Sequence, residues 1–367
     1  MSQSIPKTMR AVVLEGHGDL DQLVYHDDWP TPQPAHGEVL IKVAACGLNN
    51  TDVNTRTAWY SKGNEGETTG GALEEADDED ATWGGAPITF PRIQGADVSG
   101  TAVAVGPGVD DAIIGKRVLI DTWLRDWNDP LNLDKCRYYG SEADGGFADY
   151  TTVDHRNVQV VESTLSDAEL ATFATSSITA ENLLNRANVA EGDTVLIPGA
   201  SGGVGSALIQ LANRRGAKTI AMASESKHGM VREVGPHAIL PRAPASLKAA
   251  LKDAIGEETV TVVADVVGGV IWPTLIDVLA RGGRYTCAGA IAGPMVEMDL
   301  RTFYLRDLTF TGATIVPPGV FADLVGYIER GEIQPLLAET FPLKDLRAAQ
   351  TAFINKRHVG NIVVTMD

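Results

Sequence analysis

Four glycines that follow an apolar run have the type and spacing of a phosphate-binding turn. Residues 194–198 read Thr-Val-Leu-Ile-Pro, and residues 199–205 read Gly-Ala-Ser-Gly-Gly-Val-Gly. Glycine lets the backbone bend sharply and approach a pyrophosphate without a Cβ in the way, and the N–H groups of a following helix hold the anion. The pattern predicts a dinucleotide site, with a plain tight turn between a strand and a helix as the alternative. The residues assigned to this site are Gly199, Ser201, Gly202, Gly203, Val204 and Gly205.

The segment after the next strand indicates which dinucleotide is bound. An NAD site usually places an acidic residue about 20 positions further on, where it accepts a hydrogen bond from the ribose 2′-OH. Here the predicted strand 219–223 is followed by Ser224, while Glu225 stands one residue late and is expected to face solvent. Lys227 is placed to meet a 2′-phosphate, the alternative being a solvated lysine at the start of a helix. The segment favours NADP(H) over NAD(H), with Ser224 and Lys227 as cofactor-binding residues.

The glycine turn belongs to a region, from about Ser163 onward, in which apolar strands alternate with helical segments. Ser166 followed by Glu169 forms a capping box in the helical pattern 165–187. Apolar strands joined by helices indicate a parallel sheet with helices on both faces. The predicted strands are 194–198, 219–223, 259–267 and 284–288, and the predicted helices are 204–215, a segment near Met230, 246–255 and 272–280.

The two ends of the chain have a different pattern. Short apolar runs before residue 160, separated by Gly, Pro and Asp, have the spacing of a small β-barrel. Residues 61–87 interrupt it and are rich in Gly, Glu, Asp and Thr, which predicts a long loop or lid. The predicted strands are 11–14, 39–43, 100–105, 117–120, 309–316 and 361–365, and a helix is predicted over 321–330.

Length and charge narrow the class of protein. A chain of 367 residues exceeds what usually packs around one core, so two domains are expected. Its 30 Lys+Arg against 48 Asp+Glu give a net charge of −18, which argues against nucleic acid and against a polybasic membrane anchor. No apolar run approaches the ~18 residues of a membrane span, and the N-terminus lacks an apolar signal core. Three widely spaced cysteines suit free thiols, so a cytoplasmic location is expected.

Much of the negative charge lies in the segment that interrupts the barrel pattern. Between residues 65 and 80 there are eight carboxylates and no Lys or Arg. They are Glu65, Glu67, Glu74, Glu75, Asp77, Asp78, Glu79 and Asp80.

Five segments, in their order and spacing, resemble the medium-chain dehydrogenase/reductase superfamily. They are 46–52 (CGLNNTD), 94–106 (QGADVSGTAVAVG), 145–150 (GGFADY), 199–205 (GASGGVG) and 356–364 (KRHVGNIVV). The resemblance implies an α/β fold with a Rossmann NADP-binding domain over 163–299. It also implies a GroES-like β-barrel catalytic domain, built from 1–162 and 300–367 and containing the acidic insertion 61–87. The active site is then expected in the cleft between the two domains.

The zinc alcohol dehydrogenases of this superfamily bind a catalytic metal through a Cys, the His of a Gly-His-Glu motif and a second Cys or its equivalent. Cys46 falls on the first position, but the motif here is Gly95-Ala96-Asp97, and the third position falls near Thr175. That set does not supply the roughly three protein ligands of a catalytic zinc. Cys136 alone stands where that branch has the four cysteines of a structural zinc. We therefore expect no zinc and a buried, structural Cys46, the alternative being a site completed by Cys46, Asp97 and water.

The glycine turn is more similar to that of the quinone oxidoreductases and enoyl reductases. That resemblance implies hydride transfer from NADPH to a small-molecule acceptor that is already activated, a quinone or an alkene conjugated to a carbonyl. Tyr60 occupies the position of the functional tyrosine of enoyl thioester reductases and is the candidate catalytic donor to the carbonyl oxygen. Asn49 matches a catalytic position that lines the cofactor carboxamide and the substrate. Asp52 is expected to fix the local turn through backbone hydrogen bonds.

The same resemblance implies further cofactor contacts. Thr179 corresponds to a residue near the nicotinamide amide. The turns after two parallel strands supply Gly268, Ala288 and Gly289, although each turn could need its glycine for conformation alone.

Partners and alternative functions follow from the remaining features. The apolar run 309–316 lies where relatives pair their Rossmann domains, so a homodimer is expected. The acidic insertion directly after Tyr60 favours a neutral quinone or enone over a polyanionic coenzyme A thioester. The alternatives are oxidation or reduction of an alcohol/carbonyl pair, and a non-enzymatic NADPH-binding protein of the same fold.

Overall fold

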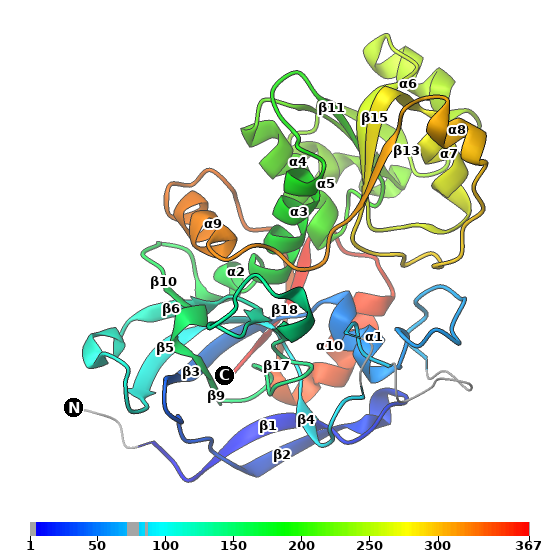
Figure 1. Ribbon diagram of the computed structural model, residues 1–367. Helices are drawn as coiled ribbons and strands as arrows, with labels where there is room; N and C mark the ends of the chain where they lie inside the picture. The colour runs from blue at the N-terminus through cyan, green and yellow to red at the C-terminus, as the bar shows by residue number, and fades with distance from the viewer. Residues whose placement is uncertain (1–4, 72–80, 85–86, 367) are drawn as a thin grey trace.

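The computed structural model describes residues 5–71, 81–84 and 87–366, and these form two domains. In Figure 1 a parallel sheet with its helices forms the upper half, and mostly antiparallel strands form the lower half. The chain passes from the lower domain to the upper one and returns, so the first strand β1 and the last strand β18 both lie in the lower half. This is the two-part α/β architecture that the sequence predicts.

The upper sheet has six strands, and every neighbouring pair is parallel. Sequential strands run outward from β11 in both directions, so β11 stands at the point where the strand order reverses. Ligands of open parallel sheets bind at the carboxyl ends of the strands next to such a point. In spatial order the strands are β13 (Ala238–Pro241), β12 (Lys218–Ala223), β11 (Thr194–Ile197), β14 (Val260–Asp265), β15 (Leu279–Cys287) and β16 (Thr309–Gly312).

Helices cover both faces of this sheet. They are α3 (Ala174–Arg186), α4 (Gly203–Arg214), α5 (His228–Glu233), α6 (Leu247–Ile255), α7 (Trp272–Asp277), α8 (Leu300–Tyr304) and α9 (Val320–Glu329). Val195 and Ile197 of β11 belong to the apolar cluster that contains α3 and α4, whereas Leu196 belongs to the cluster that contains α6 and α7. Because both faces are covered, the strands are continuously apolar. No helix among the described residues is long and apolar enough to cross a membrane.

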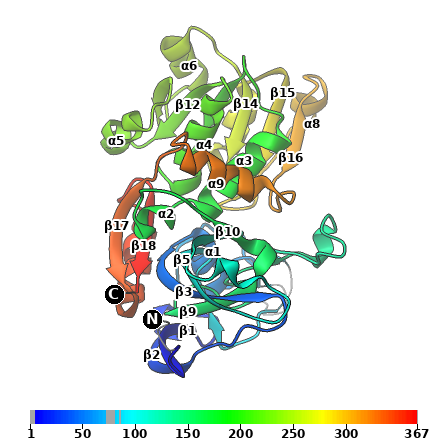
Figure 2. The same ribbon diagram turned by 90° about the vertical axis from the view of Figure 1, so that its left-hand side faces the viewer.

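The central strand of the lower domain is β3, which pairs antiparallel with β5, β9 and β18. Its strands are β1 (Thr8–Leu14), β2 (Leu23–Pro30), β3 (Glu38–Gly47), β4 (Arg92–Ile93), β5 (Asp97–Val105), β6 (Arg117–Ile120), β7 (Trp123–Leu124), β8 (Arg137–Tyr138), β9 (Tyr150–Asp154), β10 (Val158–Val160), β17 (Leu337–Pro342) and β18 (Asn361–Thr365). Its helices are α1 (Asn50–Arg56), α2 (Asp167–Leu170) and α10 (Leu346–Ile354). Figure 2 shows β17 and β18 running along one side of the molecule up to the junction of the domains.

The observed elements differ from the predicted ones at several places. β15 begins at Leu279, within the helix predicted over 272–280, and the sequence analysis predicts no strand at β2, β9, β13 or β17. The helical pattern 165–187 is divided into α2 and α3, and the Ser166–Glu169 capping box begins α2 as predicted. The strand predicted over 309–316 ends at Gly312, and it pairs with β15. The parallel sheet therefore extends past residue 299, where the sequence analysis ends the Rossmann domain.

The described part of the insertion 61–87 contains no α-helix or strand, in keeping with the predicted loop. The backbone N–H of Thr68 donates to the Ile291 carbonyl of the upper domain at 3.0 Å. The guanidinium of Arg56, a fully buried side chain, donates to the Gly70 carbonyl at 2.9 Å. The insertion is thus attached to both domains. Six of its eight carboxylates lie outside the described residues, namely Glu74, Glu75, Asp77, Asp78, Glu79 and Asp80.

Candidate functional site

The glycine turn joins β11 to α4, as the sequence predicts. Gly199 has a φ of +66°, a left-handed conformation that glycine adopts without strain. A Cβ on Gly205 would overlap the Gly199 carbonyl oxygen and lie 2.6 Å from Ala200 Cα. Glycine here lets the first turn of α4 pack directly against the end of the strand, which is the geometry of a dinucleotide-binding turn.

The N-terminus of α4 supplies the groups that a pyrophosphate needs. Gly202 is the N-cap, so the amides of residues 203–205 have no carbonyl partner within the helix. The aligned peptide dipoles of this 12-residue helix place partial positive charge there. The Ser201 carbonyl accepts the Gly360 amide at 3.0 Å, so the returning chain lies across the turn. The residues present fit a dinucleotide.

Lys227 lies beside this turn, where it ties the returning chain to the upper domain. Its ammonium donates to the carbonyl oxygens of Lys356 at 2.6 Å and His358 at 2.7 Å, and lies 3.5 Å from Ser201 Oγ. Burial, and then the nearby Arg242, lowers the pKa of Lys227. Two of the three ammonium protons are thus directed to backbone, an arrangement that the sequence did not indicate.

The end of β12 carries no acidic side chain directed into the fold. Ser224, the next residue, is half-buried, and Glu225 is exposed, as expected. Among the described residues, this strand end therefore has no carboxylate that could accept a hydrogen bond from a ribose 2′-OH. Lys227 and Arg242 instead place positive charge nearby.

The other predicted cofactor residues lie at the carboxyl edge of the sheet or on the helix beside it. They are Thr179 on α3, Gly268 after β14, and Ala288 and Gly289 after β15. Gly268 has a φ of +61°. Buried Asp265, which the sequence analysis did not single out, holds this turn by accepting the Gly268 amide at 3.2 Å and the Tyr285 hydroxyl at 2.9 Å. The conformation of this turn is enough to explain a glycine at position 268, so the predicted contact of Gly268 with a cofactor stays a prediction.

On the barrel side, Asn49 and Asp52 begin α1. Asp52 is almost fully buried. Its carboxylate accepts hydrogen bonds from the backbone N–H groups of Asn49 at 2.8 Å and Gly95 at 3.2 Å. The expectation that Asp52 fixes the local backbone is confirmed. Burial and the like charge of Asp97, opposed by these hydrogen bonds, raise the pKa of Asp52 to about 7.

A second buried carboxylate connects the two domains. Asp97 at the start of β5 accepts the backbone N–H of Thr175 at 2.9 Å and also its hydroxyl, on the first turn of α3. Thr175 Oγ1 also lies 2.7 Å from the hydroxyl of Tyr138 on β8. Burial raises the pKa of Asp97 to about 6, although Thr175 and the nearby Asn49 side chain oppose the shift. The sequence analysis considered Thr175 only as a missing metal ligand and did not consider Tyr138.

Tyr60 and Asn49 lie near these carboxylates. Burial raises the pKa of Tyr60, while hydrogen bonds with the side chains of Thr51 and Asn54 oppose the shift and the charge of Asp52 adds to it. The Asn49 side chain is nearly buried and close to Asp97, but its Nδ2 makes no well-formed hydrogen bond with the described residues. An unpaired buried amide is unfavourable unless a ligand or water satisfies it.

Cys46, Asp97 and Thr175 stand at the three positions that the sequence analysis compares with a zinc site. The Cys46 thiol is fully buried beneath Gly95, where an added Cβ would lie 2.7 Å from Sγ, and burial raises its pKa well above the ordinary value. Thr175 donates two hydrogen bonds to one oxygen of the Asp97 carboxylate, Oδ1. No three His, Cys, Asp or Glu side chains of the described part of the chain are grouped to hold a metal. A catalytic zinc needs about three such ligands and an open position.

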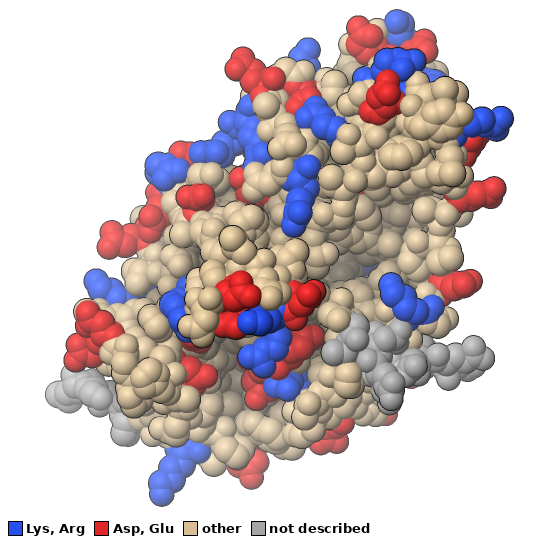
Figure 3. All heavy atoms as spheres, in the orientation of Figure 1, with Lys and Arg blue, Asp and Glu red and all other residues tan. Residues whose placement is uncertain are grey.

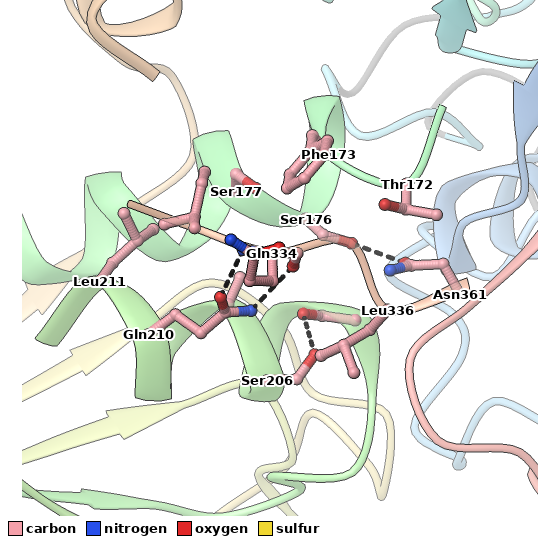
Figure 4. Close-up of a pocket in the computed structure, with 13 residues that line it drawn as sticks. Thr172, Phe173, Ser176, Ser177, Ser206, Gln210, Leu211, Gln334, Leu336 and Asn361 are labelled. Carbon is pink, nitrogen blue, oxygen red and sulfur yellow. Dashed lines mark hydrogen bonds between the residues drawn. The ribbon is translucent and has the colours of Figure 1, made fainter. Parts of the chain in front are cut away.

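The molecular surface is hollowed between the upper and the lower domain, on the face shown in Figure 3. A cavity of about 20 Å³ lies between α3, α4 and the returning chain (Figure 4). Gln210 and Gln334 close one side of it through a pair of hydrogen bonds of 3.1 and 2.7 Å, and Ser176 donates to Asn361 at 3.0 Å. About one water fits such a volume, so this cavity belongs to the domain junction and holds neither substrate nor cofactor.

Two family models match the chain. One, described as an alcohol dehydrogenase GroES-like domain, matches residues 35–163, and the other, described as a zinc-binding dehydrogenase, matches residues 203–330. A crystallised protein of Sinorhizobium meliloti 1021, described as a "putative alcohol dehydrogenase", is 45% identical with a TM-score of 0.90, covering 100% of this chain and 98% of that one.

Two curated proteins are more distantly similar. An acryloyl-coenzyme A reductase of Metallosphaera sedula is 25% identical over 374 residues, which cover 97% of this chain and 100% of that protein. A quinone oxidoreductase of Homo sapiens is 25% identical over 357 residues, which cover 95% of each.

Proposed function

Because the chain belongs to the medium-chain dehydrogenase/reductase superfamily, we propose that it is an NADPH-dependent oxidoreductase that reduces a quinone, or the activated C=C bond of an enone or enoyl compound, without a metal ion. The donor set at the domain junction supports this most directly. The Cys46 thiol is buried with a raised pKa, and Asp97 Oδ1 accepts two hydrogen bonds from Thr175. A site whose side chains do not form a metal-ligand set favours an acceptor that is already activated.

The two curated relatives support the same class of acceptor. The name of one specifies an acryloyl thioester, in which the C=C bond is conjugated to a carbonyl, and the name of the other specifies a quinone. In both, hydride addition places negative charge on an oxygen, where a hydrogen-bond donor stabilises it.

The bound nicotinamide cofactor would supply the hydride. Tyr60 would donate a hydrogen bond to the oxygen on which charge develops, since its raised pKa keeps the hydroxyl protonated at neutral pH. Asn49 Nδ2, buried and without a well-formed hydrogen bond to the described residues, would bind a carbonyl oxygen of the cofactor carboxamide or of the substrate. Both side chains come from the lower domain, and the glycine turn comes from the upper one.

An activity screen tests the proposal. NADPH and NADH are offered with quinones, enones, enoyl thioesters, alcohols and aldehydes, with and without a chelator, and the metal content of the protein is measured. We expect NADPH-dependent reduction of a quinone or an activated alkene that the chelator does not change. Stoichiometric zinc on which activity depends would refute the proposal and support an alcohol dehydrogenase, which the 45% identity to the Sinorhizobium protein favours. NADPH binding without oxidation by any acceptor would point to a non-enzymatic binding protein.

We propose that Lys227 gives the protein a preference for NADPH. Its ammonium is within 3.5 Å of Ser201 in the glycine turn, and the strand end beside it lacks a buried acid. A charged hydrogen bond to a 2′-phosphate contributes about 1.5–3 kcal/mol, or roughly 10- to 100-fold in affinity. Lys227→Ala should weaken NADPH binding by this factor and NADH binding by much less, whereas Lys218→Ala, at the exposed start of β12, should change neither. An equal loss for both cofactors would mean that Lys227 serves only to hold residues 356–358.

The acidic insertion is proposed to favour neutral substrates. It begins directly after Tyr60 and contacts the Ile291 carbonyl across the domain junction. Replacing its eight acids by Gln and Asn should improve the use of coenzyme A thioesters at low ionic strength, because it removes charges that repel the nucleotide phosphates. No change at low salt would count against this.

We also propose that the protein is a homodimer through the edge of the parallel sheet. β16 is the last strand of the sheet, so one row of its backbone groups has no strand partner in the part of the chain that the structure describes. Leu300, Tyr304 and Leu305, in and after α8, are more than half exposed. A second copy placed edge to edge would cover both features.

A further inference from the structure

We infer that Tyr138 supplies the proton that completes the reduction, and that Thr175 positions the Tyr138 hydroxyl; this rests on the proposed function of a hydride-transferring reductase. The two hydroxyl oxygens lie 2.7 Å apart. Thr175 in turn donates its hydroxyl and its backbone N–H to Asp97 Oδ1. Two hydroxyls and a carboxyl group therefore form an unbroken hydrogen-bonded chain at the junction of the domains.

The Tyr138 ring is held firmly in place. It packs edge-on against Trp123, with ring centroids 5.2 Å apart, and against Trp83 at 6.4 Å. The Tyr138 backbone N–H donates to Glu142 Oε2 at 2.8 Å, and the Trp83 indole N–H donates to the same oxygen at 2.9 Å. Trp83 belongs to the insertion 61–87. Packing on these rings fixes the direction of the hydroxyl, as proton transfer to a bound acceptor requires.

Tyr60 is connected differently, although its charge lies close enough to Tyr138 to affect the Tyr138 pKa. Its hydroxyl is hydrogen-bonded to the side chains of Thr51 and Asn54, two close neighbours in sequence. Neither group releases a proton at neutral pH, so Tyr60 suits the binding of the charged oxygen. Tyr138 is instead linked through one hydroxyl to a carboxyl group, which exchanges protons readily.

The step balances in atoms and charge. A bound nicotinamide cofactor would supply the hydride with its two electrons, and this hydride would form the first new C–H or O–H bond of the product. The O–H bond of Tyr138 breaks as its proton forms the second new bond of the product. This relay requires the protonated form of Asp97, in which the hydrogen bond is reversed and the carboxyl group donates to Thr175 Oγ1. The Thr175 proton then moves to the tyrosinate oxygen, the Asp97 proton replaces it, and water protonates Asp97 again.

Four variants and one isotope experiment test the assignment. Tyr138→Phe removes the hydroxyl and keeps the ring. Tyr139→Phe is the matched control, since Tyr139 is also buried and hydrogen-bonded to a threonine, Thr151, but is not part of the chain. Thr175→Val removes the positioning hydroxyl, and Thr175→Ser restores it. Initial rates with NADPH and the best acceptor of the screen are measured in H₂O and D₂O, together with NADPH affinity and melting temperature.

We expect Tyr138→Phe to lower kcat on the order of 10²-fold, with KM and NADPH affinity within about twofold of wild type. Thr175→Val should lower kcat by about 10-fold, Thr175→Ser should recover most of it, and the solvent isotope effect should change in both impaired variants. Tyr139→Phe should keep the wild-type kcat. If the wild type is active and Tyr138→Phe keeps its kcat, the assignment of Tyr138 is wrong, although the proposed function stands. If the kcat of Thr175→Ser is no higher than that of Thr175→Val, Thr175 does not position the Tyr138 hydroxyl. If Tyr138→Phe does not fold, the Thr175 pair decides. An inactive wild type would refute the proposed function itself.

Discussion

Replacing Asp52 by asparagine should change how stability depends on pH. The folded-state pKa of Asp52 is raised from 3.8 to about 7 because the side chain is buried and lies near the charge of Asp97. The native state therefore binds a proton more tightly than the unfolded chain does. Stability falls as the pH rises through the window from about 4 to about 7, and the full penalty is present above it.

The size of the effect follows from this shift. A difference of about 3 pKa units corresponds to about 4 kcal/mol in total, of which about 3 kcal/mol falls between pH 5 and pH 8. An asparagine side chain cannot ionise, so that part of the pH dependence disappears in Asp52→Asn. The variant also replaces one carboxylate oxygen by an NH₂ group, which would face the backbone N–H of Asn49 or of Gly95. Because two donors cannot form a hydrogen bond, this costs about 1 kcal/mol at every pH.

The assay is chemical denaturation of wild type and Asp52→Asn at pH 5 and pH 8, with Asp253→Asn as a control at an exposed position of α6. On going from pH 5 to pH 8, Asp52→Asn should gain about 3 kcal/mol relative to wild type, and Asp253→Asn should follow the wild type. The same pH dependence in wild type and Asp52→Asn would refute the reasoning, because it would mean that Asp52 titrates alike in the folded and unfolded chains.

Three further predictions concern the domain junction, a helix start and the sheet edge. Gly203→Ala should weaken NADPH binding by at least about 10-fold, measured by fluorescence titration. A Cβ at this position would overlap the side chains of Ser176 and Asn361 and displace the first turn of α4. Unchanged affinity for NADPH would contradict this prediction. Ser166→Ala should lower the free energy of unfolding by about 1 kcal/mol in urea denaturation, because the capping box that begins α2 is lost. Leu300→Glu should convert the proposed dimer to a monomer in light scattering, and the proposal fails if the wild type is already monomeric or the variant stays dimeric.

Local patterns located most elements of the parallel sheet, but not β13, and they placed a helix over 272–280 where β15 begins. The run 194–198 became β11, and the helix predicted over 204–215 became α4 with its start shifted by one residue. These signals lie in consecutive residues, where apolar runs, glycine spacing and capping residues act on the backbone directly. The strand predicted over 309–316 was too long, because an apolar run does not show where pairing with β15 stops.

The environment of Lys227 illustrates what a local pattern leaves open. Its place after β12 was read correctly, but its donation to the carbonyls of Lys356 and His358 depends on residues more than 120 positions away. Nothing near Lys227 in the sequence indicates that the C-terminal segment returns to this turn. The 2′-phosphate assignment therefore stays a prediction, which the comparison of the two cofactors tests.

The sequence by itself determined the glycine turn, the alternation of strands and helices, and the absence of a histidine at position 96, since each depends on neighbouring residues or on a single residue type. Only the tertiary structure decided that Tyr138, Thr175 and Asp97, from β8, α3 and β5, share one hydrogen-bonded chain. A hydrogen bond requires its donor and acceptor to lie within about 3 Å of each other. For groups separated by tens of residues, that distance is set by how the two domains pack.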